Sequence, residues 1–114
     1  MRDDRGRLLD ILEAIDSIER RVAQGKDAFA RDEMLQVWVV HHLQIVGEAA
    51  ANISADLRER YPSIPWADIV AMRNVLVHHY FGIDLDQVWD TVRIDLPVLR
   101  QRVETILSEL KRET

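Results

Sequence analysis

The 114-residue sequence contains no cysteine, and this absence excludes several classes of protein. A disulfide scaffold, a thiolate nucleophile and a sulfur-rich metal site all require cysteine. The N-terminal stretch MRDDRGRLLDILEAIDSIERR also lacks an uninterrupted apolar run, so neither a signal peptide nor a membrane span is expected there. We therefore expect a cytoplasmic protein with no membrane partner, no cofactor and no metal ion.

Positive charge is in the minority, because 15 lysine and arginine residues stand against 20 aspartate and glutamate residues, for a formal net charge of −5. Such a chain has no general electrostatic attraction for nucleic acid, so an RNA-directed function needs a local basic patch or a specific pocket. Thirteen of the basic residues are arginine, the side chain suited to two-pronged contacts with phosphate or carboxylate. Codon bias is the stronger explanation for that excess.

No segment alternates between apolar and polar residues in the manner of a strand, and helical periodicity runs along the chain instead. The pattern predicts main helices at residues 3–24, 28–53, 65–78 and about 85–111. Asp84 with Gln87 resembles a capping box for the last helix, and Pro97 should kink that helix near Asp95. We expect one domain over residues 1–114, an all-α antiparallel four-helix bundle with a short extra helix.

The second predicted helix carries a stretch of small residues, GEAA, from Gly47 to Ala50, which permits the close approach of another helix. The carboxylate of Glu48 is costly to bury there unless it is paired, and Arg73 is a plausible partner that Glu48 would orient. A solvent-facing Glu48 on the far side of the helix is an equally good interpretation.

The tryptophans and the first pair of histidines are assigned to packing. Trp38, Trp66 and Trp89 are expected to be core or interface anchors and not base-stacking platforms. His41 and His42 are adjacent, so they project about 100° apart on a helix and cannot form a helical metal pair. His42 falls on the apolar side of its helix and is expected in the core.

The stretch RNVLVHHYFGID, Arg73 to Asp84, gathers polar groups where a helical pattern ends at Gly82. It contains a permanent cation, an amide, a phenol and two groups that titrate near neutrality, His78 and His79. Metal-free RNA cleavage needs a base for the 2′-hydroxyl, an acid for the leaving 5′-oxygen and a cation for the charge on the pentacoordinate phosphate. Histidine suits both proton transfers, and arginine suits the phosphate.

The spacing of this stretch poses a geometric problem, because Arg73 and His78 are five residues apart. On an ideal helix they would point about 140° apart and would not share a face. Either the helix unwinds before His78, as Gly82 allows, or two protomers bring their motifs together across a two-fold axis. We favour a composite site in a homodimer.

The ordered set of Arg73, Asn74, His78 and Tyr80 resembles the Arg-x4-His-x-Tyr signature of HepT-like toxins of the HEPN superfamily. The segments GEAA, YPSIPW, FGID and DLPVLR are similar to the same family, so the likeness covers roughly residues 8–110. The resemblance implies a HEPN-like helical dimer that cleaves tRNA or mRNA without metal and leaves a 2′,3′-cyclic phosphate. It also implies a type VII-like toxin–antitoxin pair, with a minimal nucleotidyltransferase as the antitoxin.

The same resemblance implies roles for the motif residues. Arg73 and His78 would be catalytic, Asn74 would support the site, and Tyr80 would accept AMP from the antitoxin. AMP on Tyr80 would add negative charge and bulk where RNA phosphate must sit. His79 departs from the family, in which this position is variable and often acidic, and it is a rival proton carrier.

Two other functions remain open. The first is a non-catalytic HEPN-type binding module for a nucleotidyltransferase partner or a nucleotide, which the acidic net charge favours mildly. The second is a plain helical scaffold in which the motif is a coincidence and Arg73 pairs with a carboxylate such as Asp68.

Overall fold

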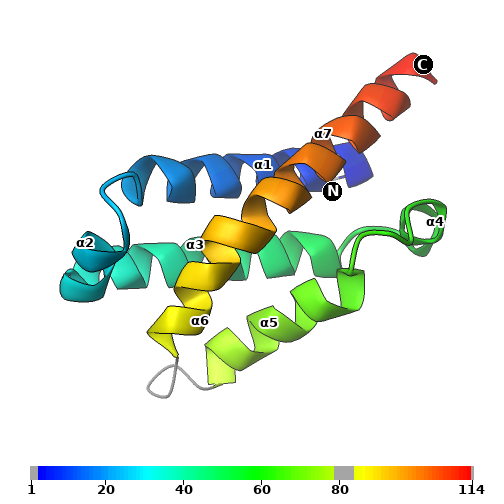
Figure 1. The fold of residues 1–114 in the computed structure, drawn as a ribbon. Coiled ribbons are helices and arrows are strands. Elements are labelled where there is room, and N and C mark those ends of the chain that lie inside the picture. The colour runs from blue at the N-terminus through cyan, green and yellow to red at the C-terminus, as the bar shows by residue number, and fades with distance from the viewer. Residues whose placement is uncertain (1–2, 79–83, 114) are drawn as a thin grey trace.

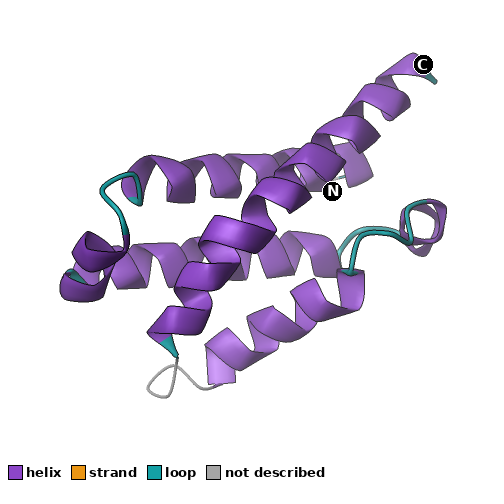
Figure 2. Ribbon diagram, viewed as in Figure 1, coloured by secondary structure: helices purple, strands orange, loops and turns teal. Residues whose placement is uncertain are grey.

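The computed structural model describes residues 3–78 and 84–113, with the backbone alone at residues 75–78. The main elements are α1 (Asp4–Arg21), α3 (Glu33–Ala51), α5 (Trp66–His78) and a rod in which α6 (Leu85–Asp90) passes through a π-helical turn (Thr91–Asp95) into α7 (Leu96–Arg112). The short helices α2 (Lys26–Arg31) and α4 (Ala55–Arg60) connect them. The described residues form helices and loops without a strand (Figure 2). The prediction of an all-α helical bundle is confirmed, with two short helices where one was expected.

The long helix α3 lies between α1 and α5 and contacts both along its length. Each of these neighbours runs antiparallel to α3, and the α6–α7 rod crosses in front of α3 and α1 (Figure 1). None of the described helices combines the length and apolar character needed to cross a bilayer.

The core forms where the apolar stripe of α1 meets α3 and α7. The buried residues of this stripe are Leu8, Ile11, Ile15, Ile18 and, just after the helix, Val22, as the periodicity predicts. Trp66 and Trp89 are also buried, which confirms their predicted packing role.

The periodicity of α3 predicts an apolar side that includes Val39, Val46 and Ala49, and all three are buried. Leu43 and Ala50 are buried as well, so the buried face is only partly the predicted one. In contrast, His42 is only partly buried, so its predicted core position was wrong. Trp38 is 37% exposed and is not a core anchor, and its alternative role as an interface anchor stays a prediction. His42 packs on the ring of Trp38 at 4.3 Å between centroids, and its Nδ1 lies 2.8 Å from the Trp38 carbonyl oxygen. Apolar residues surround most of α3 because two helices pack on it, and the pattern alone therefore could not locate the centre of its buried face.

The single helix predicted over residues 28–53 was also wrong, because Asp32 divides it. Asp32 has an extended backbone, and its carboxylate accepts a hydrogen bond of 3.1 Å from the amide of Leu35. Aspartate is more favourable as an N-cap than inside a helix, so α2 ends and α3 begins at this residue.

The last helix begins and bends where the sequence predicts. The carboxylate of Asp84 accepts hydrogen bonds from the amides of Asp86 and Gln87, at 3.0 and 3.3 Å, which confirms it as an N-cap. The π-helical turn ends at Asp95, two residues before Pro97, which has no amide hydrogen to donate. The expected distortion near Asp95 is confirmed.

Candidate active site

Arg73 projects from α5 where this helix packs closely against Gly47 of α3. A Cβ atom added to Gly47 would clash with the Cβ of Arg73 and would lie only 3.2 Å from the carbonyl oxygen of Ile69. The absence of a side chain at Gly47 therefore sets how closely the two helices approach. The close contact predicted from the GEAA stretch is confirmed.

The guanidinium of Arg73 is held by two neighbours. Its Nη1 forms an ion pair with the carboxylate of Glu48, and its Nη2 donates a hydrogen bond of 3.1 Å to Oδ1 of Asn74. The side chain of Asn52 in turn donates to the Glu48 backbone carbonyl at 2.8 Å. Within the described residues, no ion pair joins Arg73 to Asp68.

Both interpretations of Glu48 hold in part. Its side chain is 58% exposed, as expected for a solvent-facing residue, yet its carboxylate also pairs with Arg73. Arg73 itself is 28% exposed, and its buried Nε has no partner among the described residues. Since a guanidinium carries five N–H donors, Arg73 keeps donors available for a ligand.

A pocket of about 500 Å³ lies in front of this arginine. Its lining combines residues of α1 (Arg7, Asp10), α3 (His41, Gln44, Ile45, Glu48, Ala49) and α5 (Arg73, Asn74). The volume falls within the range of about 300–1,000 Å³ that is usual for ligand sites. The structure therefore brings Arg73, Asn74 and Glu48 together on one concave surface.

The remaining motif residues are placed only in part. Helix α5 continues from Arg73 to His78, so it does not unwind before His78 and that explanation of the spacing was wrong. The two backbone positions are about 140° apart around the helix axis. His79 and Tyr80 lie outside the described residues. The other explanation, that motifs from two protomers meet, stays a prediction.

A family model described as "Ribonuclease HepT-like" matches residues 11–106 of the chain. The chain belongs to this family. A protein named "Putative RNase MJ1380", from Methanocaldococcus jannaschii, is 40% identical over 106 residues, which cover 92% of this chain and 97% of the relative. A protein named "Probable ribonuclease HepT", from Thermococcus cleftensis, is 39% identical over 100 residues, 87% of this chain and 91% of the relative. No solved structure matches.

Four residues of the HepT-like pocket were not identified from the sequence. Arg7 and Asp10 lie on α1, far from the motif along the chain, and His41 and Gln44 lie on the exposed edge of α3. The sequence marks these residues only as polar positions beside apolar stripes. Their place beside Arg73 depends on how three helices pack, which a pattern along one helix does not reveal.

Metal ligation has no visible basis in the described part of the chain, where no group of three or more histidine and carboxylate side chains is arranged to hold an ion. His41 lines the pocket, whereas the adjacent His42 packs against Trp38.

Proposed function

We propose that this HepT-like protein is a metal-independent endoribonuclease, the toxin of a type VII-like toxin–antitoxin pair, and that it cleaves tRNA or mRNA as a homodimer. The observation that carries the proposal is the position of Arg73, held by Glu48 and Asn74 on the wall of an open pocket. An arginine oriented in this way is suited to bind a phosphate and to stabilise the charge that develops during cleavage.

In the proposed reaction, a histidine removes the proton of the RNA 2′-hydroxyl, and the 2′-oxygen attacks the adjacent phosphorus. The bond from phosphorus to the 5′-oxygen breaks, and a second proton carrier protonates the leaving oxygen. The products are a 2′,3′-cyclic phosphate and a 5′-hydroxyl. A two-fold site would supply His78 twice, once as base and once as acid.

Other residues take supporting roles in this scheme. Glu48 and Asn74 are positioning residues, because they contact the Arg73 guanidinium and fix its direction. His79 is the alternative proton carrier, next to His78 in the chain.

Regulation is proposed to act through Tyr80, which would accept AMP from a minimal nucleotidyltransferase antitoxin. Each AMP group adds a phosphate charge and a bulky nucleoside. Two residues from His78, such a group would occupy the space that the RNA backbone needs.

The proposal is tested by expressing wild type, Arg73→Ala, His78→Ala, His79→Ala and Tyr80→Phe proteins in a bacterial host without any partner. Growth and total RNA integrity are followed after induction. We expect arrest and RNA cleavage for the wild type, His79→Ala and Tyr80→Phe. Loss of proton transfer at His78 should lower cleavage by about 10²-fold to 10⁴-fold. The His78→Ala and Arg73→Ala strains should therefore grow normally.

Equal growth and intact RNA in all five strains, with soluble protein of unmodified mass, would contradict the ribonuclease proposal. That result would favour the alternative, a HEPN-type module that binds a nucleotidyltransferase or a nucleotide without cleavage. Two observations favour this alternative: the net charge of −5 and the pairing of Arg73 with Glu48, which offsets its charge in the free protein.

A further inference from the structure

Arg7 lines the same pocket as Arg73 but differs from it in its contacts. Its side chain is partly buried, and its Nε is buried without a hydrogen-bond partner. In the part of the chain that the structure describes, no hydrogen bond or ion pair involves the Arg7 guanidinium. The Nη groups of Arg7 therefore keep their N–H donors available for a ligand in the pocket, whereas one Nη of Arg73 is already paired with Glu48.

The charges around the pocket separate the two arginines further. Glu48 forms an ion pair with Arg73 and compensates its charge, whereas no carboxylate among the described residues pairs with Arg7. The carboxylate of Asp10 also lines the pocket, but Arg7 is the arginine of the lining whose guanidinium an entering anion would meet without a paired carboxylate among the described residues. The planar guanidinium favours phosphate, because two of its N–H groups match two phosphate oxygens.

The fold places the two arginines on opposite sides of one helix. Arg7 belongs to α1 and Arg73 to α5, and these helices flank α3 (Figure 1). The polar side chains of His41 and Gln44 line the pocket on α3 between them. An extended strand that crosses the exposed edge of α3 could contact both guanidinium groups at once.

We infer that Arg7 is a substrate-binding residue that holds an RNA phosphate neighbouring the scissile one. The inference rests on the proposed ribonuclease function and extends it. It assigns one RNA phosphodiester to Arg73 and a neighbouring one to Arg7, on opposite sides of α3. The ligand is then an RNA strand of at least two nucleotides. Arg7 takes no part in proton transfer, so its loss should weaken substrate binding more than it slows chemistry.

The first test is steady-state cleavage of a short single-stranded oligoribonucleotide by wild type, Arg7→Gln, Arg7→Lys and Arg5→Gln proteins. Arg5 is the matched control, since it is an exposed arginine of the same helix that does not line the pocket. For Arg7→Gln, loss of a charged hydrogen bond should raise KM about tenfold or more, with kcat changed less than about threefold. Arg7→Lys should recover part of the loss, and Arg5→Gln should match the wild type.

The second test neutralises individual phosphates in the oligonucleotide by replacing one flanking linkage at a time with an uncharged methylphosphonate. At one flanking position, the replacement should raise the KM of the wild type by about the same factor by which Arg7→Gln raises KM on the natural strand. Arg7→Gln should be insensitive to that replacement, because the partner of the phosphate is already absent. Such coupling distinguishes a direct contact from a structural effect of the substitution.

The outcomes separate this inference from the proposed function. If the wild type cleaves RNA but Arg7→Gln has an unchanged KM, or if the methylphosphonate penalty is the same in both proteins, the Arg7 inference is wrong and the ribonuclease proposal stands. If the wild type cleaves no RNA, the ribonuclease proposal fails. Fluorescence anisotropy with the same oligonucleotides then decides the role of Arg7, and equal affinity of wild type and Arg7→Gln would overturn it.

Discussion

Arg73 and Glu48 form an ion pair whose main value is orientation. Both side chains retain contact with solvent, and partly exposed ion pairs of this kind contribute at most about 1 kcal/mol to stability. The pair instead directs the guanidinium into the pocket and leaves some of its donors open. The sequence indicated Glu48 as a candidate partner, but solvent exposure was an equally good interpretation until the relative rotation of α3 and α5 was known.

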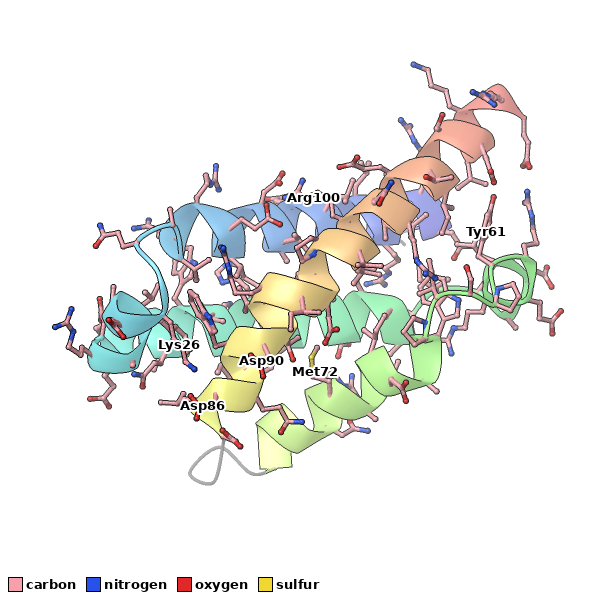
Figure 3. All side chains as sticks on the ribbon, viewed as in Figure 1. Lys26, Tyr61, Met72, Asp86, Asp90 and Arg100 are labelled. Carbon is pink, nitrogen blue, oxygen red and sulfur yellow. The ribbon has the colours of Figure 1, made fainter. Side chains whose placement is uncertain are left out.

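A second residue-scale feature ties the short helix α4 to the end of α7. The hydroxyl of Tyr61 donates a hydrogen bond to the carboxylate of Glu109, and Figure 3 shows Tyr61 beside α7. This hydrogen bond, together with partial burial, raises the pKa of Tyr61 above its ordinary value of 10.0. The folded state therefore favours the neutral phenol, and the stabilisation is complete below about pH 10 and is lost as the pH rises through the raised pKa.

We expect Tyr61→Phe to lower the free energy of unfolding by about 1 kcal/mol at pH 7, through loss of the hydrogen bond. The difference from the wild type should shrink above about pH 10, where the wild type loses its own stabilisation. Urea denaturation followed by circular dichroism at a series of pH values measures both effects. A difference that stays constant up to pH values well above about 10 would contradict the assigned cause.

At the scale of the elements, contacts between helices keep the pocket-bearing face in place. Arg100 of α7 forms ion pairs with Asp16 and Glu19 of α1, and it lies over α1 in Figure 3. A weaker ion pair of 3.4 Å joins the exposed side chains of Lys26 and Asp86. Ion pairs as well as apolar core contacts therefore attach the α6–α7 rod to α1.

Gly47 is the element-scale position whose substitution should have the clearest effect. In Gly47→Ala, the new methyl group meets the Cβ of Arg73, which is attached directly to the backbone and cannot rotate away. Overpacking of this kind costs about 1–3 kcal/mol, and the gain in helix propensity offsets roughly 1 kcal/mol of it. We expect reduced thermal stability and a larger loss of RNA cleavage, because α5 must move and carries Arg73 with it.

Thermal unfolding and cleavage assays on the same Gly47→Ala preparation measure these two quantities. Ala51→Gly provides a control for helix propensity alone, since it lies at the end of α3 and outside the pocket lining. Unchanged cleavage by a destabilised Gly47→Ala protein would show that the distance between α3 and α5 does not control the position of Arg73.

At the scale of the whole molecule, the unbroken helix α5 separates Arg73 and His78 within one protomer. The proposed homodimer predicts that inactive variants complement each other. Co-expressed Arg73→Ala and His78→Ala chains with different tags would form a heterodimer that retains one Arg73 and one His78. This heterodimer should recover part of the cleavage activity, while each homodimer stays about 10²-fold or more below the wild type.

The control pairs wild type with the double variant Arg73→Ala, His78→Ala, which places both intact residues in one chain. In heterodimers purified through both tags, an independent site in each protomer would leave this control active and the mixed single variants inactive. Light scattering coupled to size exclusion measures the mass of every preparation. A monomeric wild type that cleaves RNA would also contradict the composite site.

The sequence alone determined the helical character, the capped start of the last helix at Asp84 and the family of the chain, because these depend on local periodicity, local hydrogen bonds and an ordered motif. It misjudged the break at Asp32, where capping competes with propensity, and the position of His42, where a helix is apolar on most sides. Only the tertiary structure decided that α1, α3 and α5 share a pocket and that Arg7 joins Arg73 there. Such neighbours are far apart along the chain, and helix rotation and packing distance bring them together.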